Sequence, residues 1–457
     1  MRTERDVIGE VQIPDNIFYG INTARARENF KITGLTADSD HIVSIAQVKK
    51  AAAMANAEAG SLDKEKADYI SKACDEIIAG KYHDQFVIDV YQAGAGTSYN
   101  MNANEVIANV ALTLMGKNKG DYSVIHPNDH VNMSQSTNDV YPTVMRLTVS
   151  KKIKKIKDQL SDLVDSMNKK SKELKGIAKP GRTHLQDAAP VTSGLEFSAY
   201  GYALKKDRDE ISDSLDYIME LNIGGTAVGT GINTSKNYKE NVVKYINEIT
   251  KENFRKSTNL LGIMQFMTDF SRVMNAVTNL ALDIEKIAND IRLLYSGPGT
   301  GIHEITIPAV QQGSSIMPGK INPSIAEAMN MICHSVIGSQ QAVNMSVQAG
   351  QLELNVMMPG IDYELTKSLD IMTNGILMFR EKLIDGIKAN ENVCREHLAN
   401  SFGSAALLNP YLGYDNVAKI VRTAVETGKP IKALVLETGK ITEEEYMKIM
   451  DSGVPKD

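Results

Sequence analysis

Apolar residues recur at helical spacing over long stretches of the chain. The most regular stripe advances in alternating steps of four and three residues and consists of Val273, Val277, Leu280, Ile284, Ile287, Ile291 and Leu294. A repeat close to 3.5 residues per turn is typical of long helices that pack side by side. A similar stripe runs from Val144 to Met167, another long helix is expected from Leu195 to about Leu221, and two more flank Gly350. The pattern predicts a mainly α protein with a central bundle of long helices.

Shorter features surround this bundle. Residues 6–13 read as strand, helical patterning begins near residue 42, and residues 92–104 read as a loop that feeds a helix at Glu105. After about residue 388 the apolar content falls. We therefore predict three domains: a mixed, mostly helical domain at 1–136, the long-helix bundle at 137–388 and a small C-terminal domain at 389–457.

The expected helices are long for a single chain. About thirty residues of helix span about 45 Å, which is more than a compact domain of this size needs. We infer that they pack against the helices of other subunits and form the core of a helical oligomer.

Composition and charge narrow the class of protein. The chain has 457 residues and a formal net charge of -6, which argues against a nucleic-acid partner because that needs a basic surface. No stretch approaches 18 consecutive apolar residues, and the start MRTERDVIGE lacks the apolar core of a signal peptide. Cys74, Cys333 and Cys394 show no CxxC spacing, which suits a reducing compartment. We expect a cytoplasmic protein that does not associate with membranes.

Five lysines between Lys151 and Lys157 form a dense basic run. Such a run could bind an anion. Because Asp158, Asp162 and Asp165 follow on the same expected helix, we interpret it as a solvated helix face.

No convincing group of metal ligands is visible in the sequence. The HxxxH spacing of His126 and His130 encloses Pro127, Asn128 and Asp129, which read as a turn and not as one helix face. We therefore expect no metal site and no organic cofactor.

Four segments dense in small polar residues interrupt the helical pattern, at residues 96–102, 134–139, 181–187 and 313–323. Each is expected at or just before a helix N-terminus, where unpaired N–H groups and the helix dipole favour anions. Helix capping explains any single segment about equally well. Four together, with His184 and Lys320 among them, favour a site for a dicarboxylate.

The last segment, GSSIMPGKINP, combines Gly313 and Gly319 with Pro318 and Pro323. Glycines that pivot and prolines that stiffen the backbone are expected of a lid that closes over a site. A connecting loop with a surface lysine is the alternative.

This segment resembles the signature loop of the aspartase/fumarase superfamily, and the resemblance covers nearly the whole chain. Other matching segments are ERDVIGEVQIP, YGINTARARENF, GAGTSYNMNANEVIAN, HPNDHVNMSQSTNDVYPT, GRTHLQDAAP, GGTAVGTG, GQLELNV and LNPYLGYD. The resemblance implies the three-domain fold of that superfamily, with a central bundle of long helices that forms the core of a homotetramer.

The resemblance also implies a reaction, the reversible anti-elimination of ammonia from L-aspartate to give fumarate through an aci-carboxylate intermediate. GTSYNMN and QSTND look like aspartate ammonia-lyases, whereas Gly225 in GGTAVGTG and GYD at 413–415 are similar to fumarases. Met358 stands where aspartases commonly carry Glu and fumarases Lys. The alternatives are a class II fumarate hydratase acting on L-malate, a lyase for a substituted aspartate, and an inactive structural relative.

Site roles follow from the resemblance. Ser314 would be the base, with its alkoxide stabilised by loop N–H groups and by Lys320. From residue chemistry alone, His184 would be chosen instead, because histidine transfers protons near neutral pH. The carboxylate that becomes the aci form is assigned to Thr97, Ser136, Thr137 and Ser315. The other carboxylate is assigned to Thr183, Lys320 and Asn322, and the amino group to Asn138 and His184, with Glu327 orienting His184.

These residues come from well-separated parts of the chain. In a bundle of long helices they would converge only across subunits. We therefore predict a homotetramer whose active sites are shared between subunits.

Overall fold

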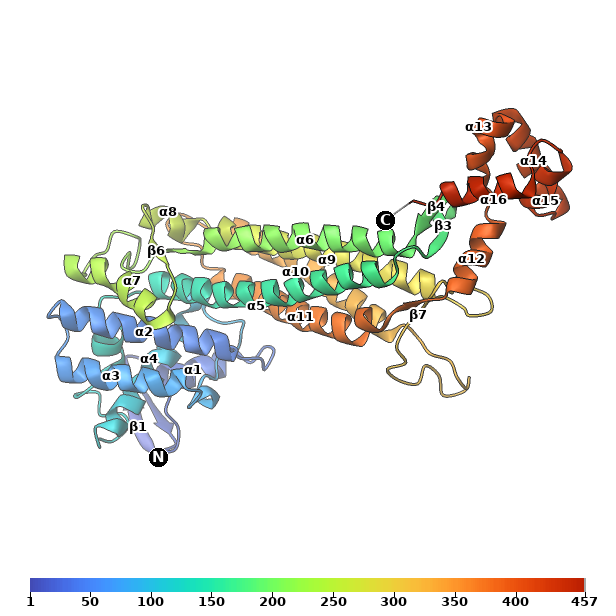
Figure 1. The fold of residues 1–457 in the computed structure, drawn as a ribbon. Coiled ribbons are helices and arrows are strands. Elements are labelled where there is room, and N and C mark those ends of the chain that lie inside the picture. The colour runs from blue at the N-terminus through green and yellow to red at the C-terminus, as the bar shows by residue number, and fades with distance from the viewer. Residues whose placement is uncertain (456–457) are drawn as a thin grey trace. The chain divides into compact units, whose positions relative to one another are not determined.

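The chain folds as a mainly α structure, as the sequence predicted (Figure 1). A computed structural model describes residues 1–455. Their contacts divide the chain into two compact units. Unit 1 comprises residues 1–157, 210–278 and 335–371, and unit 2 comprises residues 158–209, 279–334 and 372 onward. The division into three domains stays a prediction.

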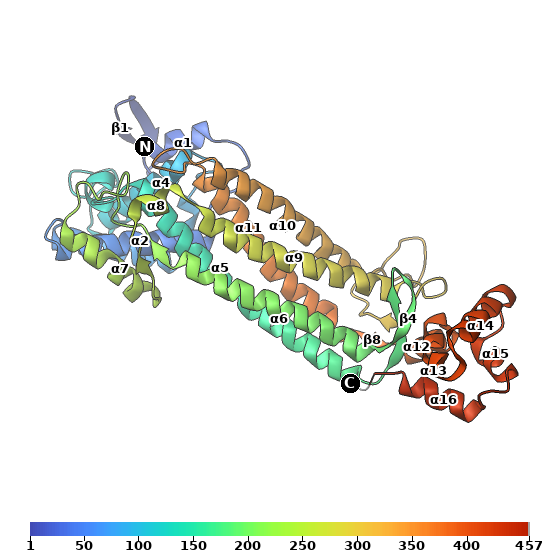
Figure 2. The same cartoon turned by 90° about the horizontal axis from the view of Figure 1, so that it is seen from above.

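The fold contains five long helices, and each unit contains a part of every one of them. They are α5 (Thr137–Glu173), α6 (Ser193–Ile218), α9 (Thr268–Tyr295), α10 (Ser324–Gln348) and α11 (Met358–Lys382). Within each unit their segments lie side by side in both ribbon views (Figures 1 and 2). The stripe that predicted α9 is buried, since none of its residues from Val273 to Leu294 is more than 6% exposed. The predicted long helices are therefore confirmed.

Unit 1 adds an N-terminal hairpin and shorter helices to these segments. The hairpin pairs β1 (Arg2–Arg5) with β2 (Glu10–Ile13) in antiparallel register, and β5 (Glu220–Leu221) pairs with β6 (Arg255–Lys256) in parallel. The helices are α1 (Ile21–Asn29), α2 (Ser39–Glu58), α3 (Lys64–Ile78), α4 (Thr97–Leu114), α7 (Lys236–Thr250) and α8 (Leu260–Gln265).

The strand predicted over residues 6–13 is wrong in its first half. Residues 6–9 form the hairpin turn, because Asp6 Oδ1 accepts hydrogen bonds from the N–H groups of Ile8 at 2.8 Å and Gly9 at 3.1 Å. Gly9 has φ +143°, a conformation that favours glycine.

The loop predicted over residues 92–104 is correct only as far as Gly96 and wrong beyond it, because α4 begins at Thr97. Its small polar residues find partners outside the helix. Asn102 is fully buried and donates to the carbonyl of Gln85 at 3.0 Å, and Asn100 donates to Thr137. Side chains that could have competed with a helical backbone are thereby satisfied by tertiary contacts.

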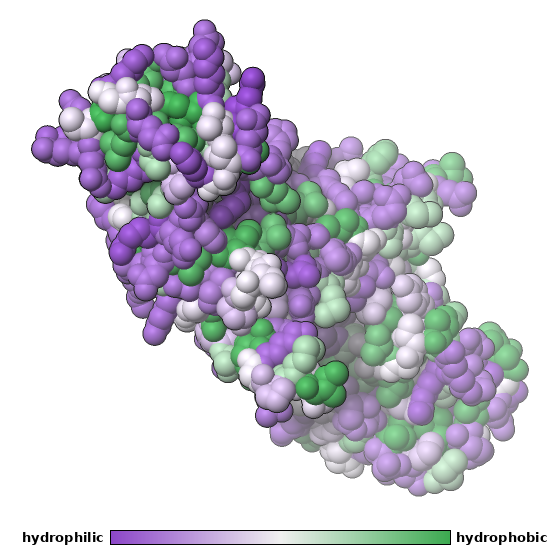
Figure 3. Space-filling view, turned by 90° about the vertical axis from the view of Figure 1, so that its right-hand side faces the viewer, coloured by the Kyte–Doolittle hydropathy of each residue, from purple (hydrophilic) through white to green (hydrophobic). Residues whose placement is uncertain are grey.

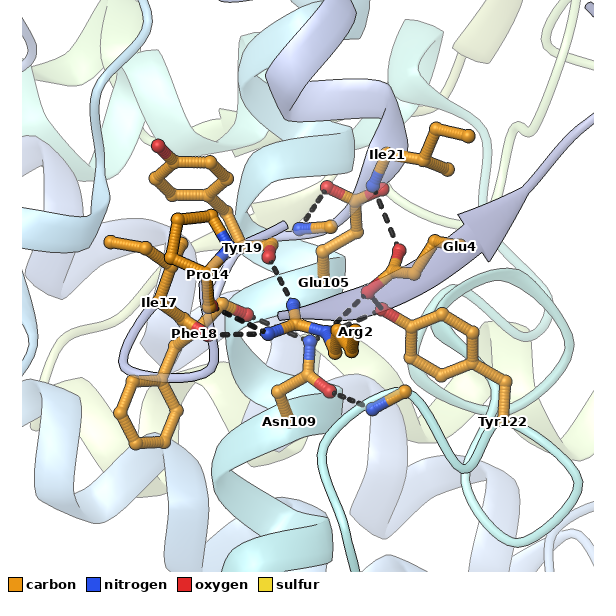
Figure 4. A network of polar contacts seen from close by, with 12 residues as sticks. Arg2, Glu4, Pro14, Ile17, Phe18, Tyr19, Ile21, Glu105, Asn109 and Tyr122 are labelled. Atoms are coloured by element: carbon orange, nitrogen blue, oxygen red, sulfur yellow. Dashed lines mark hydrogen bonds and ion pairs between the residues drawn. The ribbon is translucent and has the colours of Figure 1, made fainter. Parts of the chain in front are cut away.

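Two buried carboxylates tie the N-terminal segment to α4 (Figure 4). Glu105 of α4 accepts hydrogen bonds from the backbone N–H groups of Gly20, Asn22 and Thr23 around the start of α1. Burial raises the pKa of Glu105, although these hydrogen bonds oppose the shift. Glu4 of β1 accepts from the N–H of Ile21 at 2.9 Å. Both carboxylates lie where the unpaired N–H groups of a helix start need acceptors.

The lysine run at 151–157 is not a uniformly solvated face. Lys152 is 2% exposed and forms ion pairs with Asp38 at 2.8 Å and Asp370 at 2.6 Å. The solvated interpretation is therefore wrong for Lys152, because its partners lie far away in sequence and a local pattern does not include them.

Unit 2 contains two small antiparallel sheets and a C-terminal group of helices. β3 (Ala178–Thr183) pairs with β4 (Gln186–Thr192), and β7 (Ile305–Thr306) pairs with β8 (Lys388–Ala389). The helices are α12 (Glu391–Asn400), α13 (Asn409–Leu412), α14 (Tyr414–Thr427), α15 (Ile431–Glu437) and α16 (Glu443–Ser452). Residues between Ala405 and Ile449 form a hydrophobic core of their own.

The surface carries polar and apolar side chains together. The face drawn in Figure 3 is mostly hydrophilic, with hydrophobic side chains in patches between the polar ones. Large apolar side chains are exposed on the long helices, including Leu282 on α9 and Met331 and Met345 on α10. Among the described helices, none combines the length and apolar character needed to cross a membrane.

Candidate active site

In unit 1, two predicted site residues lie at the starts of helices. Thr97 is the first residue of α4, and Thr137 is the first residue of α5. Asn100, one turn into α4, donates to Thr137 Oγ1 at 2.9 Å and thereby joins the two helix starts. Gly96, just before Thr97, packs on the ring of Tyr141, which a Cβ at that position would overlap at 2.1 Å. The local packing therefore brings Thr97 and Thr137 to one place.

Ser136 and Asn138 belong to the same helix start. Ser136 Oγ accepts from the N–H of Asn138 at 3.2 Å, and Asp139 Oδ1 accepts from the N–H of Ser136 at 2.9 Å. The Asn138 amide donates to the carbonyl of Ala227 at 2.8 Å. This is helix capping, as the alternative interpretation expected, and it also fixes the direction of the polar groups.

The hydroxyls of Ser136 and Thr137 each accept a hydrogen bond from the protein. A hydroxyl has one hydrogen to donate, and acceptance leaves that hydrogen free. Thr97 differs, because its hydroxyl donates a long hydrogen bond of 3.4 Å to the carbonyl oxygen of Gly94. Half-buried Ser136 and Thr137 thus have hydroxyl hydrogens free for an anion, whereas exposed Thr97 donates to an anion only after it gives up its long hydrogen bond to Gly94.

Two buried ionisable side chains, Lys49 and Asp139, lie near this surface, and sequence analysis assigned neither of them a role. Lys49 of α2 is fully buried and donates to Asn132 Oδ1 at 2.8 Å and Gln135 Oε1 at 3.0 Å. Burial lowers the pKa of Lys49 to about 7, with the charge of Asp139 opposing the shift. Burial raises the pKa of Asp139 to about 6, although N–H groups of Ser136, Thr226 and Gly224 lower it. The available signal was a lysine within the Ala-rich stretch VKKAAAMANAEA at residues 48–59.

In unit 2, the lid segment is folded back on itself. The Asn322 amide donates to the carbonyl of Gly313 at 2.8 Å, and the N–H of Gly313 donates to the carbonyl of Lys320 at 2.9 Å. A Cβ at Gly313 would lie 2.4 Å from the carbonyl oxygen of Lys320, so the segment can fold back on itself in this way only with glycine at 313. Ser314 Oγ accepts from the N–H groups of Ile316 at 3.2 Å and Met317 at 3.0 Å. Ser315 beside it is exposed.

The base of the lid borders a cavity of about 890 Å³. Three predicted site residues line it: Lys320, Asn322 and Glu327. Glu327 lies in the first turn of α10. The cavity is thus lined by the ammonium group of Lys320, the amide of Asn322 and the carboxylate of Glu327.

Sequence analysis missed the other polar residues of this cavity, which include Arg292, Tyr295 and His303. Tyr295 donates to the carbonyl of Ile321 at 3.1 Å and so anchors the lid base. Among the described residues, His303 Nδ1 is buried without a hydrogen-bond partner. The available signal was the glycine-rich turn SGPGTG at 296–301, directly after the stripe of α9.

Thr183 and His184 do not lie at a helix start, which corrects the sequence prediction. Thr183 ends β3, and His184 with Leu185 forms a two-residue hairpin turn with φ +54° and +60°. Positive φ at both central residues is typical of a type I′ turn. All three side chains are exposed, so the hairpin presents them at its tip.

A buried ion-pair network holds this hairpin. Glu304 is fully buried and contacts Arg182 of β3 at 2.6 Å, Lys179 of β3 at 3.0 Å and His397 of α12 at 3.0 Å. Burial raises the pKa of Glu304, but the hydrogen bond from Arg182 and the charge of Lys179 outweigh it and leave the pKa below its ordinary value. The carboxylate therefore stays charged and fixes the strand that carries Thr183.

Two predicted groupings are not found within one chain. Among the described residues, His184 forms no ion pair with Glu327, and neither Thr183 nor His184 lines the cavity that contains Lys320. Within the described part of the chain, no group of three or more His, Cys, Asp or Glu residues could hold a metal ion.

Comparison with known families defines the chain as a lyase. The family described as Lyase matches residues 9–338, and the family described as Fumarase C C-terminus matches residues 405–453. The chain belongs to the aspartase/fumarase superfamily, which confirms the resemblance found in the sequence.

Curated relatives match over nearly their full length. The chain is 44% identical to the aspartate ammonia-lyase of Helicobacter pylori, over 97% of this chain and 96% of the relative. It is 44% identical to that of Bacillus subtilis, over 98% and 95%, and 43% identical to that of Escherichia coli, over 97% and 94%.

Solved structures share the fold. A fumarate lyase:delta crystallin from Brucella melitensis bound to cobalt has a TM-score of 0.95 at 41% identity, over 99% of this chain and 98% of that chain. A class II fumarase from Schistosoma mansoni has a TM-score of 0.94 at 32% identity, over 98% of each chain.

Proposed function

We propose that the protein is an aspartate ammonia-lyase, which converts L-aspartate reversibly into fumarate and ammonia. Relatives that are 43–44% identical over nearly the whole chain carry this name. The observation that carries the chemistry is the state of the hydroxyls, because Ser136, Thr137 and Ser314 each accept a hydrogen bond from a protein N–H. Ser136 and Thr137 can then donate to a carboxylate, and Ser314 can be stabilised as an anion.

Ser314 is the proposed base. An ionised serine takes the Cβ proton of L-aspartate, and the electron pair of the C–H bond moves into the adjacent carboxylate, which becomes an aci-carboxylate dianion. Two backbone N–H groups already point at Ser314 Oγ, and these lower the free energy of its alkoxide. Collapse of the dianion forms the C=C bond as the C–N bond breaks, and ammonia leaves with the electron pair.

The dianion needs directed donors that are in place before the reaction. Thr97, Ser136 and Thr137 supply hydroxyls from the starts of α4 and α5, where the helix dipoles favour negative charge. Ser315 of the lid completes this group when the lid closes.

The rest of the substrate is assigned to the other segments. Lys320 supplies a fixed positive charge to the second carboxylate, with Thr183 and Asn322 as neutral donors. Asn138 and His184 contact the departing amino group, and Glu327 orients His184.

We further propose that the protein is a homotetramer with shared active sites. The exposed apolar side chains of Leu282, Met331 and Met345 on the long helices support burial against other subunits. The exposed tip of the His184 hairpin supports insertion into a neighbour. The three buried free cysteines, Cys74, Cys333 and Cys394, support a cytoplasmic location.

An assay of substrate choice tests the proposed activity. Absorbance of fumarate is followed with L-aspartate and, separately, with L-malate, together with enzymatic detection of ammonia. We expect fumarate and ammonia in equal amounts from L-aspartate and little fumarate from L-malate. Preferred turnover of L-malate would instead make the protein a fumarate hydratase, the function that its fumarase neighbour carries.

A further inference from the structure

We propose that Asn100 is a positioning residue that fixes the direction of the Thr137 hydroxyl, and that buried Lys49 orients Asn100 through Asn132. This inference rests on the proposed function, because it concerns a hydroxyl of the proposed active site. The residues come from separate segments of unit 1. Lys49 lies in the middle of α2, Asn100 lies one turn into α4, and Asn132 lies in the turn before α5.

The four side chains are joined by a series of hydrogen bonds. Lys49 Nζ donates to Asn132 Oδ1 at 2.8 Å, and the amide nitrogen of Asn100 donates to the same oxygen at 3.3 Å. This nitrogen also donates to Thr137 Oγ1 at 2.9 Å. Lys49 is fully buried and Asn100 is 1% exposed, so the protein supplies these partners and water does not.

Each bond of the series has a fixed direction, because the Lys49 ammonium group has N–H donors and no acceptor. Asn132 therefore presents its carbonyl oxygen to Lys49, and the same oxygen faces the Asn100 side chain. Of the two ends of the Asn100 amide, only the nitrogen can donate to that oxygen, and this nitrogen also faces Thr137. Thr137 Oγ1 must then accept, and its own hydrogen stays available for the substrate.

An unpartnered oxygen supports this orientation of Asn100. Its Oδ1 is buried and has no hydrogen-bond partner among the described residues, which lowers stability. Turning the amide by 180° would let Oδ1 accept the hydroxyl hydrogen of Thr137. The same turn would place Oδ1 against Asn132 Oδ1, where two acceptors would face each other with no hydrogen between them. The contact of Asn132 with Lys49 thus explains why the amide keeps the orientation that leaves one oxygen unpartnered.

Lys49 is itself held by a second amide. Its Nζ donates to Gln135 Oε1 at 3.0 Å, and the Gln135 amide nitrogen donates to the carbonyls of Val131 at 3.0 Å and Met133 at 3.1 Å. Burial lowers the pKa of Lys49 to about 7. A neutral amine still has two N–H groups, which is enough for Asn132 and Gln135, so the direction of the series is the same above and below that pH.

The consequence is a hydroxyl that is oriented before the reaction begins. A preorganised donor needs no reorientation when negative charge develops on the substrate. Without Asn100 the Thr137 hydroxyl can rotate, and part of its stabilisation of the dianion is lost. Because the dianion carries more charge than the substrate, the loss belongs mainly to kcat and less to KM.

A double-mutant cycle tests the proposal, with kcat and KM for L-aspartate as the readout. Asn100→Leu removes the amide, and Thr137→Val removes the hydroxyl on which it acts. We expect Asn100→Leu to lower kcat about tenfold and to change KM less than about threefold, since it weakens one donor without removing it. In the Thr137→Val background the same change should lower kcat less than about twofold, because its target is absent.

Two further variants complete the cycle. Asn104→Leu is the matched control, because Asn104 is fully buried on the same helix and, within the described part of the chain, its amide donates only to the sulfur of Met101 at 3.6 Å. It should leave kcat unchanged in both backgrounds. Lys49→Met should lower kcat several-fold where Thr137 is present and have little effect on kcat in the Thr137→Val background.

Two results of the cycle would overturn the proposal. One is a kcat that Asn100→Leu does not lower. The other is an equal fold-loss of kcat with and without the Thr137 hydroxyl, because Asn100 would then act independently of it. An equal fold-loss for Lys49→Met in both backgrounds would overturn the part assigned to Lys49.

Neutron diffraction from deuterium-exchanged crystals of the unchanged protein gives a second test, which requires neither activity nor a folded variant. We expect one amide deuterium of Asn100 to lie between its nitrogen and Thr137 Oγ1, and the Thr137 deuterium to point away from Asn100. A Thr137 deuterium directed at Asn100 Oδ1 would overturn the proposal. Failure of the proposed function has a different signature, namely no turnover of L-aspartate by the unchanged protein, and the cycle is then measured with L-malate.

Discussion

At the scale of single residues, the proposed chemistry depends on hydroxyl hydrogens that the protein leaves free. Thr137 is the clearest case, because its Oγ1 accepts from Asn100 at 2.9 Å and its own hydrogen has no partner among the described residues. Thr137→Val keeps the branched shape and removes the donor. We expect kcat for L-aspartate to fall about 10²–10³-fold, by analogy with the loss of an oxyanion donor.

Steady-state kinetics checks this prediction. Thr148→Val is the control, because Thr148 lies on the same helix and, within the described part of the chain, its hydroxyl bonds only the carbonyl of Val144 at 2.9 Å. The control should keep its kcat. A Thr137→Val protein that keeps most of its kcat would remove Thr137 from the site.

Lys49 gives a prediction for stability against pH. Burial lowers its pKa from 10.5 to about 7. Between these values the unfolded chain binds one proton more than the folded chain, so the free energy of unfolding rises with pH. In the Lys49→Met variant this lysine is absent, so its contribution to the increase of the unfolding free energy with pH is absent too. We expect the unfolding free energy of the unchanged protein, relative to Lys49→Met, to increase by about 1–3 kcal/mol from pH 7 to pH 9.5.

Urea unfolding at several pH values provides the measurement. Lys151, whose pKa burial lowers to about 8, titrates in both proteins and cancels in the difference. A difference that stays constant from pH 7 to pH 9.5 would show that Lys49 is not buried as a perturbed amine.

At the scale of elements, the β3–β4 hairpin depends on one buried carboxylate. Glu304→Gln leaves Arg182, Lys179 and His397 without the negative charge that they share. We expect a loss of about 2–4 kcal/mol in unfolding free energy, because a buried ion pair loses one partner. Lys179 keeps Glu196 at 2.9 Å, which limits the loss.

The pH dependence of this effect has a defined sign. Because the folded pKa of Glu304 lies below its ordinary value of 4.5, its stabilisation is present above that pH and is lost as the pH falls through the folded pKa. Chemical unfolding of both proteins at pH 7 and pH 3.5 checks it, with exposed Glu391→Gln as the control. An equal difference at both values would contradict the assignment.

The elements also show what a sequence can predict. The long helices were predictable because their apolar stripes are local and periodic, as in Val273 to Leu294. The start of α4 and the hairpin at His184 were not predictable from the sequence, because each depends on partners that are distant along the chain. Asn102 is satisfied by Gln85, and the strand before His184 is held by Glu304, more than a hundred residues later.

The candidate site was likewise predictable from the sequence only in part. Hydroxyl-rich helix starts and the lid were visible as dense polar segments and as a family resemblance. Lys49 and His303 left only weak local signals, a lysine in an Ala-rich stretch and a glycine-rich turn, because a single charged or polar residue gives no pattern that assigns it a role. Their roles depend on which segments pack against them.

At the scale of the whole molecule, each chain supplies two groups of site residues. Thr97, Ser136 and Thr137 belong to unit 1, whereas His184, Ser314 and Lys320 belong to unit 2. The central proposal is that each active site takes these groups from different protomers of a tetramer. Sedimentation should therefore give a tetramer as the active species.

Complementation between two inactive variants tests this claim most directly. Ser314→Ala and Thr137→Val are each assayed alone and after joint unfolding and refolding in equal amounts. We predict that each alone is nearly inactive and that the mixture regains up to about a quarter of the unchanged activity, because random assembly gives that share of sites both intact residues. A mixture no more active than the average of the two variants would contradict shared sites.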